Sequence, residues 1–354
     1  MTDKEGLKIL AFTNDTASHV WRFDPQARRM NEQTPHQMAL APASRWGGDT
    51  LGADIVIMEM LSGTAMVDTA HNMGAKVIYE ADDPVTDTYG KERKNLMHVS
   101  EEHKSSSIET IGKVDAVTTT NEILAKNLRR YTDAPIYVMP ILMDYLYYGE
   151  AVSVELPKRN TDEIRIGWFG GAGHFEDLRM VLPALRKLIE KDKRVKFVYC
   201  GYGGMESESL AMKAQWGEDV LKEIPRERRE FMPGVPEEYW PMKHRFMDLD
   251  IGICPLIDDN FNKHKEGTKW LEYSALGIPA VCSSTVYDRY VSHGKTGLIA
   301  KTEDGWYGSL LELIRKSNLR KQIGISAEKE VRDNYNADTS WQRWVKIYQD
   351  IVQK

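Results

Sequence analysis

The feature that most constrains the fold of this chain is a regular alternation of short apolar runs with longer segments of helical periodicity. The runs in the first half are "LKILAFTN", "ADIVIMEM", "AKVIYEADD", "VDAVTTT" and "PIYVMPI", and those in the second are "EIRIGWFGG", "VKFVYCGYGG", "LDIGICPL", "IPAVCSS" and "GLIAKTED". Runs of this length and composition are typical of strands that are buried on both faces. Segments between them, such as "DLRMVLPALRKLIEKD", predict amphipathic helices. Strands that alternate with helices predict parallel sheets with right-handed crossovers.

A polar stretch that contains a proline, residues 149–163 ("GEAVSVELPKRNTDE"), separates the two series of strands. With 354 residues, of which 42% are hydrophobic, the chain is long enough for two cores. We therefore expect two Rossmann-like, doubly wound α/β domains, residues 1–155 and 156–335, that face each other across a central cleft. The last segment, 336–354, predicts an amphipathic helix with Trp341, Trp344 and Ile347 on one face, packing back toward the N-terminal domain.

Charge and composition exclude several classes of protein. A net charge of −6 gives no overall attraction to nucleic acid or to anionic membranes, although a local basic cleft remains compatible with it. The start of the chain has no apolar signal-peptide core, and no segment is apolar enough to span a membrane. The cysteines Cys200, Cys254 and Cys282 are odd in number and lack metal-site spacing, which indicates buried thiols in a cytoplasmic protein.

Ligands of open parallel sheets bind beyond the carboxyl ends of the strands. One loop at such an end, in "IRIGWFGGAGHFEDLR", is a glycine-rich turn that includes Gly170 and Gly171 and leads into a helix. Backbone N–H groups in such a turn can bind phosphate. The sequence lacks the third glycine of the dinucleotide fingerprint and the Gly-Lys-Ser/Thr of a P-loop, so an ordinary tight turn is the alternative.

A second loop, "FNKHKEGTKWLEYSALGIPAV", places Lys265 and Lys269 at the start of a helix that we expect to begin near Thr268, with that threonine as its N-cap, and to end at Gly277. Cations are disfavoured at a helix N-terminus. The lysines are therefore either solvated or neutralised by an anion between them. Glu272, one turn into the helix, could hold a diol such as ribose, or could pair with Lys269 in solvent.

Three further stretches carry candidate functional groups. In "VIYEADDPV", Asp82 and Asp83 could bind a metal, act as a base or cap a turn. In "GVPEEYW", the turn at Val235 could expose backbone groups to a nucleobase, with an ordinary turn as the alternative. In "TNDTASHVWRFDP", His19 and Arg22 could contact an anionic or hydroxylated ligand, although a solvated arginine is the simpler interpretation.

Taken together, these motifs resemble the GT-B-fold glycosyltransferases, and more narrowly a divergent branch of their retaining family four. The resemblance covers nearly the whole chain. The run "LEYSALGIPAVCSS" is similar to the family's "LEAMAxGxPVV", "HGKTGLIA" to its "xGxxGxLV", and "HVWRFDP" and "KVIYEADDPV" to its early loop and first-domain strand. The resemblance implies a GT-B fold with an acceptor-side first domain and a second domain that binds a nucleotide sugar.

The resemblance also implies roles for individual residues. Glu272 would hold the donor ribose, and Val235 would pair with the nucleobase through its backbone. The diphosphate would be bound by glycine-rich and helix-start backbone at Gly170, Gly171, Gly267 and Thr268. Lys265, and to a smaller extent Lys269, would neutralise the departing nucleoside diphosphate.

The sequence departs from the family pattern at three positions. His264 stands in place of the first glutamate of the family's E-x7-E motif, and Asp82 in place of its first-domain histidine. His174 stands near the position of the arginine and lysine that usually follow the first strand of the second domain. We therefore expect Lys265 to carry the phosphate charge, and Asp82 or Asp83 to orient a sugar hydroxyl or the acceptor.

The implied function is retaining transfer of a sugar from a nucleotide sugar, UDP-hexose being the commonest, to a hydroxyl acceptor. A polysaccharide, a lipid-linked sugar or a hydroxylated base in phage DNA would all suit such a cleft. We expect no metal and no cofactor other than the nucleotide-sugar co-substrate. Two alternatives remain open, a GT-B-like sugar-nucleotide epimerase and a catalytically inactive nucleotide-sugar-binding module.

Overall fold

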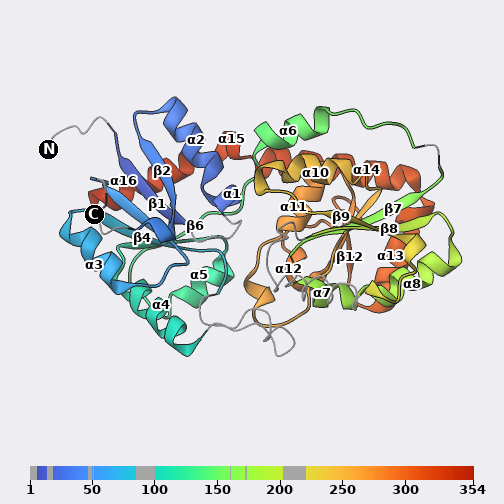
Figure 1. The fold of residues 1–354 in the computed structure, drawn as a ribbon, viewed down its shortest axis with the longest axis horizontal. Helices are drawn as coiled ribbons and strands as arrows, with labels where there is room; N and C mark the ends of the chain where they lie inside the picture. The colour runs from blue at the N-terminus through green and yellow to red at the C-terminus, as the bar shows by residue number, and fades with distance from the viewer. Residues whose placement is uncertain are drawn as a thin grey trace.

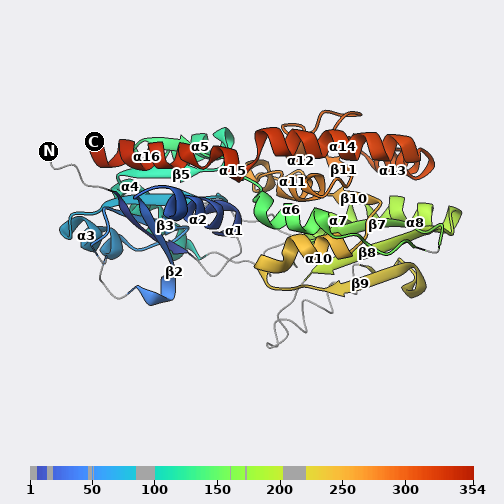
Figure 2. The same cartoon turned by 90° about the horizontal axis from the view of Figure 1, so that it is seen from above.

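The computed structural model describes residues 6–13, 19–46, 50, 52–84, 100–159, 161–171, 174–201 and 221–354. Within these ranges the strands form two parallel sheets with helices on both faces, as Figures 1 and 2 show from two directions. The α/β class expected from the alternating sequence pattern is therefore confirmed. We refer to the sheet β1–β6 with its helices as the N-terminal half, and to the sheet β7–β12 with its helices as the C-terminal half.

The sheet of the N-terminal half has the order β2-β1-β3-β4-β5-β6, and neighbouring strands pair in parallel. Its strands are β1 (Lys8–Thr13), β2 (Gln37–Pro42), β3 (Ile55–Glu59), β4 (Lys76–Ala81), β5 (Ala116–Thr119) and β6 (Ile136–Val138). The helices that accompany them are α1 (His19–Arg22), α2 (Asp24–Gln33), the short η1 (Ala43–Arg45), α3 (Thr64–Asn72), α4 (Glu101–Lys113) and α5 (Glu122–Leu128).

The sheet of the C-terminal half has the order β12-β11-β10-β7-β8-β9, again with parallel pairs. Its strands are β7 (Ile164–Phe169), β8 (Val195–Gly201), β9 (Arg229–Pro233), β10 (Ile251–Cys254), β11 (Ala280–Ser283) and β12 (Leu298–Ala300). The helices are α6 (Tyr145–Ser153), α7 (Phe175–Arg179), α8 (Leu182–Lys191), α10 (Trp240–Phe246), α11 (Thr268–Ala275), α12 (Ser284–Tyr287), α13 (Glu303–Arg315) and α14 (Ser317–Asn334), with the short turns η4 (Arg226–Arg228), η5 (Glu237–Tyr239) and η6 (Asn262–His264).

Each sheet is covered on both faces by an apolar layer. One face of the C-terminal sheet packs against α8 and α13, through side chains such as Leu185 and Leu310, and the other packs against α11 and α14. In the N-terminal half, α3, α4 and α5 cover one face and α2 covers the other. Burial on both faces explains why the strands are continuous apolar runs.

The chain returns to the N-terminal half at its end. After α14 it continues through α15 (Ala337–Ser340) into α16 (Gln342–Gln353), which lies beside the N-terminal sheet (Figure 1). Trp341, Trp344 and Ile347 are buried there in the same apolar cluster as Ile9 and Ile57. The amphipathic face expected for this helix is thus observed.

Two segments cross between the halves side by side. Met143 and Asn336 form an isolated parallel bridge, in which the N–H of Met143 donates to the carbonyl of Tyr335 (2.7 Å) and the N–H of Ala337 donates to the carbonyl of Met143 (3.0 Å). The helix α6 follows the first crossing and includes residues 149–153, the beginning of the polar stretch expected as a linker.

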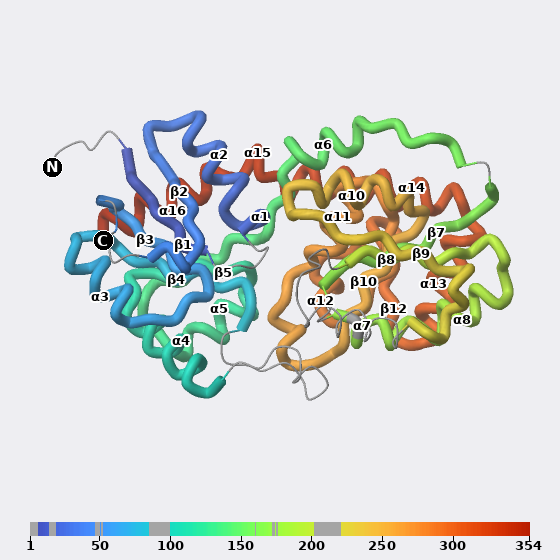
Figure 3. Tube along the Cα trace, in the orientation of Figure 1, coloured from blue at the N-terminus to red at the C-terminus, as the bar shows by residue number. Residues whose placement is uncertain are grey.

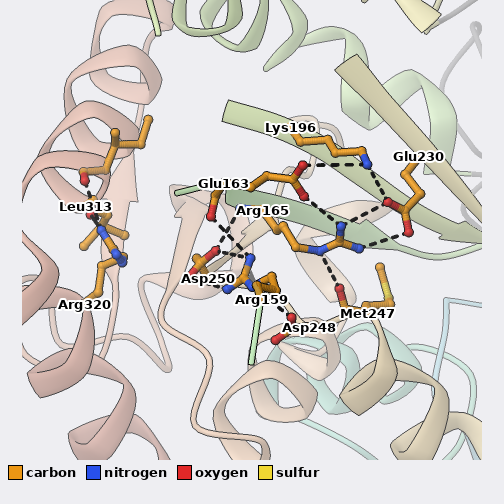
Figure 4. Close-up of polar contacts among 11 residues, drawn as sticks. Arg159, Glu163, Arg165, Lys196, Glu230, Met247, Asp248, Asp250, Leu313 and Arg320 are labelled. Atoms are coloured by element: carbon orange, nitrogen blue, oxygen red, sulfur yellow. Dashed lines mark hydrogen bonds and ion pairs between the residues drawn. The ribbon is translucent and has the colours of Figure 1, made fainter. Parts of the chain in front are cut away.

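A charged network occupies the amino ends of the C-terminal strands (Figure 4). The guanidinium of Arg165 makes two hydrogen bonds to Glu230, of 3.0 and 3.1 Å, and hydrogen bonds to this arginine and to Lys196 lower the pKa of Glu230 to about 2. Arg159 of the linker pairs with Asp248 and Asp250 in the same region. The network and the glycine-rich turn therefore lie at opposite ends of the strands of this sheet.

None of the helices within the described ranges combines the length and the apolar character needed to cross a membrane.

Candidate functional site

The predicted site residues converge where the carboxyl ends of strands from the two sheets approach each other. Asp82 and Asp83 follow β4, and Gly170 and Gly171 follow β7, while residues 172 and 173 of the glycine-rich turn lie outside the described residues. The helices α1 and α5 lie on the side of the N-terminal half that faces the C-terminal half (Figure 3). The carboxyl ends of the strands are where open parallel sheets bind their ligands.

Lys265 and Asp83 join the two halves across this edge. The ammonium of Lys265 lies 3.0 Å from both carboxylate oxygens of Asp83 and 4.8 Å from the ring centre of Phe261. The side chains are 18% and 27% exposed, so water screens the pair only partly. An anion therefore does lie at Lys265, and in this structure it is a carboxylate of the opposite half.

Asp82 is half-buried next to this pair. Burial and the neighbouring carboxylates of Asp83 and Glu80 raise its pKa to about 6, against the attraction of Lys265 and Arg22. A carboxyl group with a pKa near neutrality can accept or return a proton at physiological pH. The pair Asp82 and Asp83 thus offers one candidate acid–base group and one ion-pair partner.

Lys269 lies directly against the glycine-rich turn. A methyl group added at Gly170 would be 3.1 Å from Cε of Lys269 and 3.3 Å from its Nζ. Burial lowers the pKa of this lysine, and Glu272 and Asp177 oppose the shift. No ion pair joins Lys269 to Glu272 among the described residues, so the solvated pair considered from the sequence is not formed. The ammonium of Lys269 therefore lies beside Gly170, at the start of the turn.

His174 cannot supply a second charge at this turn. Its Nδ1 lies 2.8 Å from Oδ2 of Asp177, whose Oδ1 accepts the N–H of Ile257 (2.9 Å). Burial, together with the nearby charge of Lys269, lowers the pKa of His174 to about 3 in spite of Asp177. The imidazole is neutral at physiological pH and does not replace the missing cations of the family pattern.

Glu272 is deeply buried. It is 4% exposed, and its Oε1 lies 3.4 Å from the hydroxyl of Tyr148 and 3.9 Å from Nδ1 of His244. Burial raises its pKa to about 8, while Lys269 and the Tyr148 hydroxyl oppose the shift. The carboxylate therefore faces two side chains, not solvent, and the ribose contact remains a prediction.

The start of α11 is formed by a glycine. Gly267 is the N-cap, Thr268 is the first helical residue, and no side chain caps the helix. The expectation that Thr268 caps the helix is therefore wrong. A methyl group on Gly267 would lie 2.8 Å from the ring of Tyr290, so a larger residue does not fit. Among the described residues, no side chain caps this helix start, which leaves its N–H groups suited to a diphosphate.

His264 takes part in a contact between the two halves. Its Nδ1 lies 2.8 Å from the carbonyl of Asn260, and its Nε2 lies 3.3 Å from Nδ2 of Asn127 in α5. The side chain is 7% exposed. His264 thus links the C-terminal half to α5 of the N-terminal half, and its contact to the nucleotide sugar remains a prediction.

No local motif in the sequence indicated a role for Glu266. Its Oε1 accepts a 2.7 Å hydrogen bond from Asn121, the N-cap of α5, and its Oε2 accepts from the hydroxyl of Tyr290. Burial raises the pKa of Glu266. Only the capping pattern "TTTNEI" hinted that Asn121 occupies a fixed position, and nothing local linked it to Glu266.

Val235 already has an intramolecular partner. Its carbonyl accepts a 2.9 Å hydrogen bond from Nε1 of Trp240, and the ring of Trp240 lies 5.2 Å from that of Trp21 in α1. The turn after β9 is thereby fixed, with Trp21 of the N-terminal half against it.

Arg22 and His19 differ in their exposure. Arg22 is 2% exposed, its Nε lies 2.6 Å from Oε1 of Glu80, and its guanidinium lies 5.0 Å from the ring of Trp344. The solvated arginine considered from the sequence conflicts with this burial, whereas the contact with a ligand remains a prediction. His19 is partly exposed, with Nε2 4.0 Å from Asp24.

Within the described ranges, no group of three or more His, Cys, Asp or Glu side chains is placed to hold a metal ion. The pair Asp82 and Asp83 therefore lacks a third ligand of these types there.

The comparisons with known proteins concern the fold and the C-terminal half. Residues 163–316 match the family model described as "Glycosyl transferases group 1". No curated protein sequence gives a significant match.

Three solved structures illustrate the likeness in fold. TarM is 13% identical with a TM-score of 0.60, and the alignment covers 83% of this chain and 54% of TarM, so the chain spans about half of that protein. HepE from Anabaena in complex with UDP-glucose is 12% identical with a TM-score of 0.68, covering 97% and 100%. Sucrose-phosphate synthase from Thermosynechococcus elongatus is 11% identical with a TM-score of 0.70, covering 97% and 99%. The GT-B arrangement of the two sheets is thereby confirmed.

Proposed function

We propose that this chain, which has the GT-B fold and whose residues 163–316 match the model of the group 1 glycosyl transferases, transfers a sugar from a nucleotide-sugar donor to a hydroxyl acceptor with retention. UDP-hexose is the proposed donor, and the complex of HepE with UDP-glucose supports this choice. A polysaccharide, a lipid-linked sugar or a hydroxylated DNA base is the proposed class of acceptor.

The observation that carries this proposal is the position of Lys269 against Gly170. A glycine turn brings phosphate oxygens close to backbone N–H groups, and the ammonium in contact with the turn supplies the opposite charge. The backbone N–H groups in the first turn of α11 could also bind the diphosphate, because Gly267 provides no side-chain cap for them. The diphosphate would therefore lie between β7 and α11.

The reaction develops negative charge on the leaving diphosphate as the glycosidic bond breaks. Fixed cations at that position stabilise the transition state more than the ground state. Lys269 would hold the diphosphate, and Lys265 would exchange its contact with Asp83 for the leaving oxygen. Asp82, with its pKa of about 6, would accept a hydrogen bond from the acceptor or from a sugar hydroxyl. These lysines would take the role of a divalent metal, so we propose neither metal nor cofactor.

We place the reaction in the cytoplasm, where the three cysteines, all free and buried, would stay reduced.

A screen of nucleotide sugars by thermal shift, followed by transfer assays with the donors that bind, tests the proposal. A bound donor stabilises the fold by mass action. We expect a UDP-hexose to raise Tm and to be consumed with release of UDP when an acceptor is added. Donor hydrolysis or epimerisation without transfer, or the absence of binding by any nucleotide sugar, would contradict it.

A further inference from the structure

Tyr148 links the segment between the two halves to the buried carboxylate of Glu272. It lies on α6, immediately after the first crossing, and is 4% exposed. Its hydroxyl donates to Oε1 of Glu272 at 3.4 Å. Although the contact is long for a hydrogen bond, it is the only one between a hydroxyl and this carboxylate within the described ranges, and it comes from a different element of the fold.

Trp21 connects the same hydroxyl to the turn after β9. Trp21 packs against the apolar cluster that contains Tyr148, and its side chain moderates the rise in the pKa of Tyr148 that burial and Glu272 cause. The ring of Trp21 also packs against Trp240, whose indole N–H holds the carbonyl of Val235. One side chain of the N-terminal half therefore supports both Glu272, through Tyr148, and Val235, through Trp240.

Glu272 and Val235 are the residues proposed to hold the ribose and the nucleobase. Neither Tyr148 nor Trp21 was singled out for this site from the sequence, and both belong to elements outside the C-terminal sheet. We propose that Tyr148 and Trp21 are positioning residues that align Glu272 and Val235, so that the nucleoside part of the donor site is complete only when the N-terminal half is docked. This role rests on the proposed function.

The groups that face Glu272 determine how its pKa changes when the Tyr148 hydroxyl is removed. They are Tyr148 on α6, His244 on α10 and Lys269 on α11. His244 is neutral because burial lowers its pKa to about 3, and its ring stacks on Phe169 with 3.7 Å between centroids. Removing the Tyr148 hydroxyl removes one of the two groups that favour the carboxylate, so the pKa of Glu272 should rise.

The test uses the full chain and measures UDP binding by calorimetry from pH 6 to pH 9, with inorganic pyrophosphate as a probe that has no ribose. The variant is Tyr148→Phe, and the control is Tyr147→Phe, on the same helix, which removes a hydroxyl that accepts from Arg28 at 3.1 Å. We expect Tyr148→Phe to weaken UDP about tenfold near pH 7 and pyrophosphate less than about twofold, since the hydrogen bond that positions Glu272 is lost. The rise of UDP affinity with pH should move to higher pH, and Tyr147→Phe should behave like wild type.

A double-mutant cycle that combines Tyr148→Phe with Glu272→Gln distinguishes the positioning of Glu272 from a general loss of structure. If Tyr148 acts through Glu272, Tyr148→Phe should add less than about twofold to the loss caused by Glu272→Gln. Trp21→Phe, which keeps a ring but removes the indole N–H, should weaken UDP in the same direction. Additive losses, equal losses for UDP and pyrophosphate, or unchanged UDP affinity in Tyr148→Phe would overturn the positioning role. A wild-type chain that binds none of UDP, GDP and ADP would overturn the proposed function itself, and the positioning role with it.

Discussion

The ammonium of Lys265 in the C-terminal half is held by both carboxylate oxygens of Asp83 in the N-terminal half, at 3.0 Å each. The cation proposed to meet the leaving diphosphate is therefore already neutralised by an acid of the N-terminal half. Such a pair fixes the lysine and also competes with the ligand. Each of these effects predicts a different response to mutation.

Asp83→Asn should strengthen UDP binding about threefold to tenfold, because the ammonium of Lys265 no longer has to leave a carboxylate. The gain should shrink as ionic strength rises, since the pair is partly exposed. Calorimetry at two salt concentrations measures both effects. Weaker binding would show that Asp83 serves mainly to position the lysine.

Lys265→Met should lower turnover about a hundredfold to a thousandfold while the apparent donor constant changes much less, because charge on the leaving oxygen grows only as the bond breaks. Lys263→Met is the matched control, since Lys263 is 53% exposed and pairs with Asp258. Steady-state kinetics with saturating acceptor provide the comparison. Normal turnover in Lys265→Met would exclude the catalytic role.

Lys269→Met should instead weaken the binding of UDP and of pyrophosphate alike, because this ammonium lies against Gly170. The sequence indicated a smaller role for Lys269 than for Lys265. The packing of Lys269 against the turn instead predicts a larger role for this lysine in binding the diphosphate. Without ligand the variant should unfold at a higher temperature near pH 7. Burial lowers the pKa of Lys269 in the folded state, so the charged form costs stability below that pKa and the cost fades as pH rises. A lower Tm would mean that the ammonium has a stabilising partner.

Glu272→Gln should become more stable than wild type as pH rises. The pKa of Glu272 is about 8 in the folded protein and about 4.5 in the unfolded chain, so folding takes up a proton between these values. The stability that this carboxyl contributes is complete below about pH 4.5 and is lost as pH rises to about 8. Urea unfolding of both proteins at pH 5 and at pH 8.5 measures the change. Equal differences at the two pH values would show that Glu272 is ionised throughout.

Transfer activity should persist in excess EDTA, because we assign the neutralisation of the diphosphate to Lys265 and Lys269. The measurement compares initial rates with EDTA alone and with EDTA followed by excess magnesium or manganese. A complete loss that either metal restores would assign Asp82 and Asp83 to a metal site.

The sequence predicted the parallel strands well because each is an apolar run of strand length. It missed β2 (Gln37–Pro42), an edge strand whose residues are mostly exposed or half-buried and have weak strand preference. The same limit applies to the site. The positions of Gly170 and Lys265 follow from local pattern, whereas the burial of Arg22 with Glu80, 58 residues apart, depends on tertiary contacts that no window of sequence contains.

Glu266 and Glu272 illustrate the physical reason most clearly. In the sequence both glutamates resemble surface residues near lysines. In the structure both are buried, because side chains from the start of α5, from α6 and from the turn after α12 fill the space around them. Local charge pairing would have left them in solvent. Contacts between elements far apart in the sequence decide their environment, and these contacts join residues more than a hundred positions apart.

The bridge between Met143 and Asn336 has a consequence for how the molecule can be divided. The chain passes between the halves twice at this point, and the final helix completes the apolar layer of the sheet that the chain builds first. A fragment ending at the linker would therefore lack Trp341, Trp344 and Ile347 and would leave Ile9 and Ile57 uncovered on that side. Dissection of this protein requires a circular permutant or a supplied C-terminal peptide, and a single cut does not yield two self-sufficient pieces.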